Sequence, residues 1–68
     1  MAVTKIIEVV GSSPESSDGA VKAALADASQ SLRNIKAVDV VSTGLRGESL
    51  TEWRALVRIS FLVERVSE

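Results

Sequence analysis

Alternation of apolar and polar side chains near the C-terminus constrains the fold more than any other feature of this sequence. One parity carries an unbroken apolar series: Trp53, Ala55, Val57, Ile59, Phe61 and Val63. The other parity is mainly polar: Glu52, Arg54, Leu56, Arg58, Ser60, Leu62 and Glu64. Because successive side chains of a strand point to opposite faces, the pattern predicts a long strand over residues 50–63. Its apolar side is expected to lie beneath a helix.

Residues 3–10 predict another strand, because they are rich in β-branched side chains and end at Gly11. Apolar residues occur on both faces of this strand, with Val3, Ile7 and Val9 on one and Ile6 and Val10 on the other. We therefore expect one face to meet a helix and the other to meet something beyond this chain.

An amphipathic helix is predicted over residues 14–33. Ser13 is the candidate N-cap with Pro14 at the first helical position, and a capping box between Ser12 and Glu15 is the alternative register. Small and apolar side chains then recur at helical spacing: Ala20, Val21, Ala24, Leu25, Ala28 and Leu32. Because this stripe is mostly alanine, the helix can lie close to a sheet.

A second strand is predicted over residues 36–43, and Gly44 and Gly47 mark a hairpin that leads into the last strand. The order strand, helix, strand, strand predicts an α+β fold with a three-stranded antiparallel sheet, the last strand in the middle and the helix on one face. The other face has no cover within the chain, although apolar side chains point there: Ile6, Val10, Val41, Leu56 and Leu62. Exposed apolar area of this kind indicates an interface.

Length and composition narrow the function. A chain of 68 residues forms one small domain, which we expect to span residues 1–68 and to be stabilised by self-association. With no cysteine and no histidine, thiol redox chemistry, zinc sites and Ser-His-Asp catalysis are excluded. The formal net charge of -1 gives no electrostatic footprint for nucleic acid or a membrane surface. No targeting segment or membrane span is visible, so we expect a cytoplasmic protein.

Four segments together resemble the dodecins, small bacterial and archaeal proteins. They are residues 6–13, Ser31-Leu32-Arg33, residues 37–40 and residues 57–64. The resemblance implies a strongly curved sheet wrapped part-way round one helix. It further implies a hollow homododecamer built from trimers, which sequesters and stores small ligands instead of transforming them. We therefore expect no enzymatic activity, which agrees with the lack of a recognisable nucleophile and base.

Flavin-binding dodecins hold FMN or riboflavin between subunits, with a tryptophan of the second strand covering the ring and a glutamine of the third strand bonded to its polar edge. The resemblance places Ala37 and Arg54 at these two ligand-binding positions. A methyl group supplies almost no stacking contact, and arginine cannot accept a hydrogen bond from the ring N–H. These departures argue against flavin binding in the family's usual mode. Trp53 does not replace the missing ring, because it has the opposite parity from Arg54.

A flavin-lacking branch of the family, the calcium dodecins, also lacks the tryptophan and has arginine at the glutamine position. The chain looks closer to that branch, which makes calcium a candidate ligand. Calcium takes six to eight oxygen ligands, however, and the carboxylates of one subunit are scattered: Glu8, Asp39, Glu52 and Glu64. Surface ion pairs are the favoured interpretation of these carboxylates, and no residue is assigned to a metal site.

Arg54 and Arg58 share one face of the last strand, where they could clamp an anion. Pairing with Glu8, Asp39 or Glu52 is the favoured alternative. The sequence therefore predicts a ligand-binding and storage oligomer. A structural or interaction oligomer that has lost the flavin site is the second hypothesis.

Overall fold

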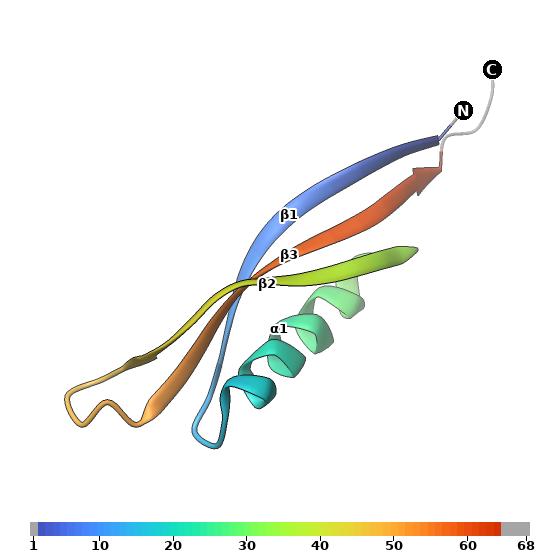
Figure 1. Ribbon diagram of the computed structural model, residues 1–68. Coiled ribbons are helices and arrows are strands. Elements are labelled where there is room, and N and C mark those ends of the chain that lie inside the picture. Colours follow the sequence, from blue (N-terminus) through green and yellow to red (C-terminus); the bar gives the residue numbers. More distant parts are fainter. Residues whose placement is uncertain (1, 65–68) are drawn as a thin grey trace.

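The structure is a computed structural model and describes residues 2–64. Strand β1 (Ala2–Ser13) is followed by helix α1 (Ser17–Ser31), strand β2 (Ile35–Arg46) and strand β3 (Glu52–Glu64). The sheet order is β1-β3-β2, and both outer strands are antiparallel to β3. Figure 1 shows the long strands bending while α1 lies against one side of the sheet. The predicted α+β fold, with the last strand in the middle, is confirmed.

Helix α1 rests on β1 at Gly11, which the sequence pattern placed at the end of the strand. The strand in fact continues through Gly11, which is paired with Ala55 of β3. A Cβ atom at Gly11 would overlap the carbonyl oxygen of Ala20 and lie 2.9 Å from the Cβ of Ala24. Gly11 is therefore a point of close contact between strand and helix, and the predicted end of the strand was wrong.

The helix begins later than predicted because β1 keeps Ser13 in the sheet, paired with Trp53. Ser16 is the N-cap, and its hydroxyl oxygen accepts a hydrogen bond of 2.9 Å from the backbone N–H of Gly19. The hydroxyl oxygen of Ser13 instead accepts from the N–H of Glu15 at 3.1 Å, within the turn that precedes the helix. Both predicted starts, with an N-cap at Ser13 or a capping box beginning at Ser12, were wrong.

The end of α1 also differs from the predicted position at Arg33. Leu32 has extended dihedral angles, and its N–H donates to the carbonyl oxygen of Ala28 at 2.8 Å. Asn34 follows with φ of 60° and turns the chain toward β2. Asparagine tolerates this left-handed conformation better than most residues.

The β2–β3 connection is a turn over residues 47–50, in which the N–H of Leu50 donates to the carbonyl oxygen of Gly47 at 3.1 Å. Gly47 has φ of +95°, which glycine adopts without steric cost. Gly44 was also expected to mark the hairpin, but it lies inside β2 opposite Arg54. Leu50 belongs to the turn, so β3 starts at Glu52 and not at the predicted Leu50.

The core lies between α1 and the apolar side of β3, as the alternation predicted. Its fully buried members are Ala20, Ala24, Ala28, Ala55, Val57 and Ile59. Only Val57 and Ile59 are large. The radius of gyration is 14.2 Å, whereas a compact domain of this length has about 11 Å. One subunit thus buries little apolar surface for its size.

The sheet surface opposite α1 is called the open face, and it carries Ile6, Glu8, Val10, Ala37, Asp39, Arg54, Leu56, Arg58 and Ser60. The side chains of Ile6 and Val10 are 57% and 56% exposed, as expected of an uncovered surface. Leu56 and Leu62 are half-buried. Val41 is exposed at an irregularity of the β2–β3 register.

Within residues 2–64, the structure contains no helix long and apolar enough to cross a membrane.

The contact at Gly11 predicts a large and specific effect on stability. Gly11→Ala is expected to lower the free energy of unfolding by at least about 3 kcal/mol, because the new methyl group meets helix backbone that cannot move aside. Urea unfolding followed by Trp53 fluorescence, at one fixed protein concentration, measures this change.

Gly44→Ala is the matched control, because the nearest atom to its new Cβ is Nη1 of Arg46, 3.0 Å away at the tip of a flexible side chain. This variant is expected to change the free energy of unfolding by less than about 1 kcal/mol. Equal losses in the two variants would contradict the importance of the Gly11 contact.

Candidate ligand-binding hollow

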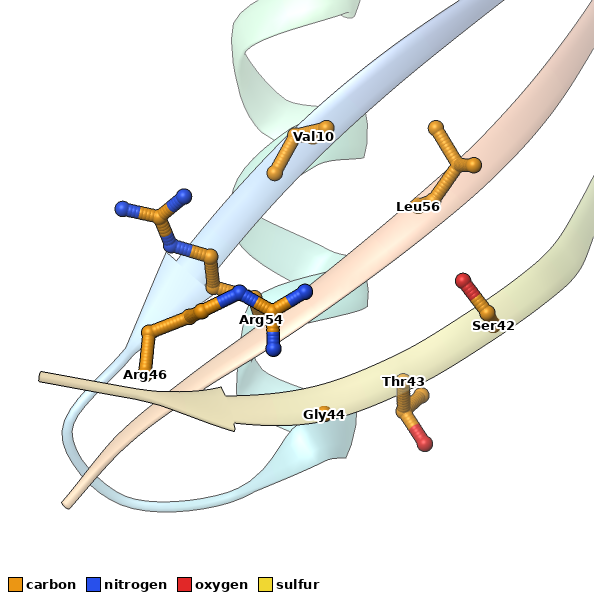
Figure 2. A pocket seen from close by; sticks show the side chains of 7 residues that line it. All are labelled: Val10, Ser42, Thr43, Gly44, Arg46, Arg54 and Leu56. Carbon is orange, nitrogen blue, oxygen red and sulfur yellow. The ribbon is translucent and has the colours of Figure 1, made fainter. Parts of the chain in front are cut away.

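The open face contains a hollow of about 210 Å³, which is lined by residues of all three strands (Figure 2). Each strand contributes to its lining, which consists of Val10, Ser42, Thr43, Gly44, Arg46, Arg54 and Leu56. The lining contains two arginines and no carboxylate. It combines concave shape, apolar walls and a few polar groups, which is the usual character of a small-molecule site.

Arg46 reaches this hollow because Gly44 has no side chain. Nη1 of Arg46 lies 3.0 Å from the place that a Cβ of Gly44 would take, so the guanidinium lies over the backbone of β2. The same Nη1 donates a hydrogen bond of 3.0 Å to the carbonyl oxygen of Leu45. This local contact holds the side chain back along its own strand, and Figure 2 shows the guanidinium directed toward β3.

Arg54 enters the hollow from β3, where its backbone is paired with Ser12 on one side and Gly44 on the other. Figure 2 shows its side chain extending toward β1. The Nε atom of Arg54 lies 3.5 Å from Oε2 of Glu52, and both side chains are about half exposed. At this distance and exposure the ion pair contributes little to stability, and it engages only the Nε end of the guanidinium.

The remaining lining is of mixed character: Val10 and Leu56 are apolar, and Ser42 and Thr43 carry hydroxyl groups. Val10 and Leu56 are cross-strand partners on the open face, and Figure 2 shows both side chains above the sheet beside the arginines. The hydroxyl group of Ser42 lies on the same side as Leu56, whereas that of Thr43 points away. Because Val10 is 56% exposed and the side chain of Arg54 is about half exposed, the hollow is open to solvent.

The structure does not bring the two predicted ligand positions together within one subunit. Ala37 is exposed on the open face opposite Ser60, whereas Arg54 lies six residues earlier on β3. This separation corresponds to about 20 Å along the strand. Ala37 does not line the hollow. A compact ligand bound to a single chain therefore cannot touch both positions.

Trp53 takes no part in the hollow, as its parity predicted. It pairs with Ser13 and Leu45 on the α1 side of the sheet and packs, half-buried, against the core. Its indole ring therefore serves packing between helix and sheet.

Arg58 is engaged elsewhere on the open face. Its Nη2 donates a hydrogen bond of 2.7 Å to Oε2 of Glu8, which confirms the favoured ion-pair interpretation for this arginine. Asp39 of β2 lies opposite Arg58 in the β2–β3 register. Across residues 2–64, no three or more Asp or Glu residues gather in a way that would hold a metal ion. Glu64, one of the four carboxylates considered for calcium, lies where side chains are outside the described part of the structure.

The sequence reasoning missed Arg46 as a partner of Arg54. It ended the second strand before Gly44, so it did not extend the strand alternation to Arg46. Continuing β2 to Arg46, which pairs with Glu52, places Gly44 and Arg46 on the same side of the strand. The signal was present in the Gly44-Leu45-Arg46 spacing, but a glycine in a strand and a glycine in a turn look alike locally.

Comparisons with known proteins agree with this arrangement. The sequence model of the Dodecin family matches residues 3–64. The protein is thus a small β-α-β-β domain with one open sheet face. Because the family model covers nearly the whole chain, the chain belongs to the dodecin family. No curated protein matched the sequence.

Solved dodecin structures superpose on nearly the whole chain. A variant of the dodecin from Thermus thermophilus is 33% identical with a TM-score of 0.85, covering 96% of this chain and 100% of the other. The dodecin from Streptomyces coelicolor is 30% identical with a TM-score of 0.88, covering 96% of each chain. The calcium dodecin from Mycobacterium tuberculosis, a calcium-chelating antigen, is 28% identical with a TM-score of 0.81 and covers 97% of this chain and 96% of its own.

The opposite orientations of Trp53 and Arg54 predict a difference in fluorescence. Arg54→Gln is expected to leave the Trp53 emission maximum unchanged, because the two side chains lie on different faces of β3. Leu45→Ala is expected to shift that maximum to longer wavelength, because directly opposed side chains on one face of an antiparallel pair lie about 5 Å apart at Cβ. A shift in the Arg54 variant but not in the Leu45 variant would contradict the observed register.

Proposed function

We propose that the chain is a non-enzymatic protein that binds and stores a small ligand as a hollow homododecamer built from trimers. The main observation in support is the open face, which exposes apolar side chains and a hollow to solvent. Family membership supports an assembly of this kind, since the fold matches dodecins over residues 3–64.

The weakness of the isolated subunit supports assembly as well. Its buried core contains three helix alanines and three residues of β3, while several large apolar side chains remain exposed: Ile6, Ile7, Val10, Val40, Val41, Leu45 and Leu50. Small domains with such a core generally need additional stabilisation from oligomerisation, disulfide bonds or a structural metal. Burying the open face against further copies would remove part of this apolar surface from water.

The ligand in this proposal is not a flavin held in the family's usual mode. The proposed ligand-site positions are Ala37 and Arg54, which offer neither an aromatic surface for the ring of FMN or riboflavin nor an amide for its edge. An oligomer that serves only structure or interaction is the alternative, supported by the same two residues. Calcium remains a candidate cargo through the likeness to the calcium dodecin, with carboxylates contributed by several copies.

Assembly is tested by light-scattering mass in native buffer. The expected mass is about twelve times that of one chain, as closed symmetry of this family would give. Ile6→Glu is expected to reduce the mass, because it replaces an exposed apolar side chain of the open face with a charge.

Ala26→Glu is the matched control for this experiment, since it adds the same charge on an exposed part of α1. It should leave the mass unchanged. A monomer or dimer for the unmodified protein would overturn the proposed architecture.

The flavin prediction is tested by titrating riboflavin and FMN against the protein while flavin fluorescence is followed. The unmodified protein is expected to cause little quenching at stoichiometric concentration. The double variant Ala37→Trp/Arg54→Gln is expected to quench strongly, because each restored ring contact contributes about 1 to 3 kcal/mol. Strong quenching by the unmodified protein would show that Ala37 and Arg54 do not prevent flavin binding.

A further inference from the structure

We propose that the hollow binds a phosphate monoester group of the stored ligand, with Arg46 and Arg54 as the residues that contact it. This inference rests on the proposed ligand-binding function and names the chemical class of its ligand. It concerns the end of the open face formed by Val10, Gly44 and Leu56, away from Ala37.

Local charge favours a dianion. The lining of the hollow holds two guanidinium groups and no carboxylate. Glu52 lies 3.5 Å from the Nε atom of Arg54 and is the cross-strand partner of Arg46, but its side chain is about half exposed, which weakens its compensation of these charges. A phosphate monoester carries a charge of about −1.5 to −2 near pH 7. It would therefore relieve the repulsion between two neighbouring cations more completely than a carboxylate, which carries one charge.

The arrangement of donors also favours phosphate. A guanidinium offers its N–H groups in a planar fork that matches phosphate oxygens. Arg46 comes from β2 over Gly44, and Arg54 comes from β3, so the two forks start from different strands (Figure 2). The guanidinium of Arg54 is directed toward β1 and that of Arg46 toward β3 (Figure 2), so a tetrahedral group accepts from both only after one of these exposed side chains has turned toward the other.

Size limits what the hollow can hold in one subunit. Its volume of about 210 Å³ is below the roughly 300 to 1,000 Å³ of pockets that enclose a whole drug-sized ligand. The hollow thus suits one compact group, and the remainder of a larger ligand would extend over the open face toward another copy.

Arg58 shows by contrast why the pair Arg46 and Arg54 is singled out. It lies on the same face but donates a 2.7 Å hydrogen bond to Glu8. Its charge is therefore already compensated by a carboxylate, and it lies outside the hollow.

Isothermal titration calorimetry of the full chain with inorganic phosphate, at low ionic strength and pH 7.5, tests the proposal. Arg46→Gln and Arg54→Gln are each expected to weaken phosphate binding about tenfold, the effect of losing one charge-assisted contact. Arg58→Gln is the matched control and is expected to leave phosphate binding unchanged. Equal weakening by all three variants would show attraction to net charge alone and would overturn the site.

Two further arms probe the class of ligand. Acetate is expected to bind at least about tenfold more weakly than phosphate, because it brings one charge and one pair of oxygens. Phosphate binding is expected to weaken between pH 7.5 and pH 5, because protonation in this range converts the dianion of inorganic phosphate to the monoanion, which has one charge fewer to offer the arginines. Acetate binding as tight as phosphate binding would overturn the assignment to phosphate.

The light-scattering mass of each variant separates this inference from the proposed function. A dodecamer that binds no phosphate would overturn the phosphate site and leave the storage assembly standing. A monomer or dimer that binds phosphate through Arg46 and Arg54 would overturn the assembly and leave the site standing. A variant whose mass falls is replaced by Arg46→Lys or Arg54→Lys, which keeps the charge but removes the planar fork and is expected to bind phosphate more weakly than the unmodified protein.

Discussion

The contact between α1 and β1 at Gly11 determines how the rest of the molecule is built. Without a side chain at Gly11, the backbone of the helix at Ala20 and Ala24 comes into direct contact with the strand. Only a helix with a small-residue stripe can use such a short approach, and Ala20, Ala24 and Ala28 provide it. At its centre the contact between helix and sheet is therefore close packing of small groups, and larger partly buried side chains such as Val21, Leu32 and Trp53 pack around it.

This manner of packing explains why the core is small. Alanines bury little apolar surface each, and among the fully buried residues only Val57 and Ile59 of the central strand have large side chains. The central strand gains cross-strand partners on both sides, and the helix covers one of its faces. Within residues 2–64, no helix or strand covers the other face. The small buried core and the uncovered sheet face thus have the same cause, which is that a single alanine-rich helix packs on one side of the sheet.

The parts of the fold that depend on periodic patterns could be predicted from the sequence. The side of β3 that faces the helix followed from strict alternation, and the helix followed from the spacing of its alanines. Element ends could not be predicted so well. Gly11 and Gly44 looked like ends because glycine commonly occurs in turns, whereas both lie within strands where another group comes close. That distinction depends on a tertiary contact, which no local pattern contains.

The candidate site was predictable in part for the same reason. Arg54 was correctly assigned to the uncovered face by parity alone, and Trp53 to the opposite face. Arg46 was missed because its role depends on the extension of β2 past Gly44. Ala37 and Arg54 come from matched family positions, but their separation of about 20 Å along β3 appears only in the folded sheet.

The two strand glycines act on opposite faces of the sheet by the same physical means. Gly11 lets the helix backbone approach β1 on the covered face, and Gly44 lets the guanidinium of Arg46 lie over β2 on the open face. In the first case the vacant volume is filled by backbone and fixes the fold. In the second it is filled by the end of a flexible side chain, which can shift when a ligand binds. The same absence of a side chain therefore produces rigidity where the helix packs and adaptability where the cationic hollow opens.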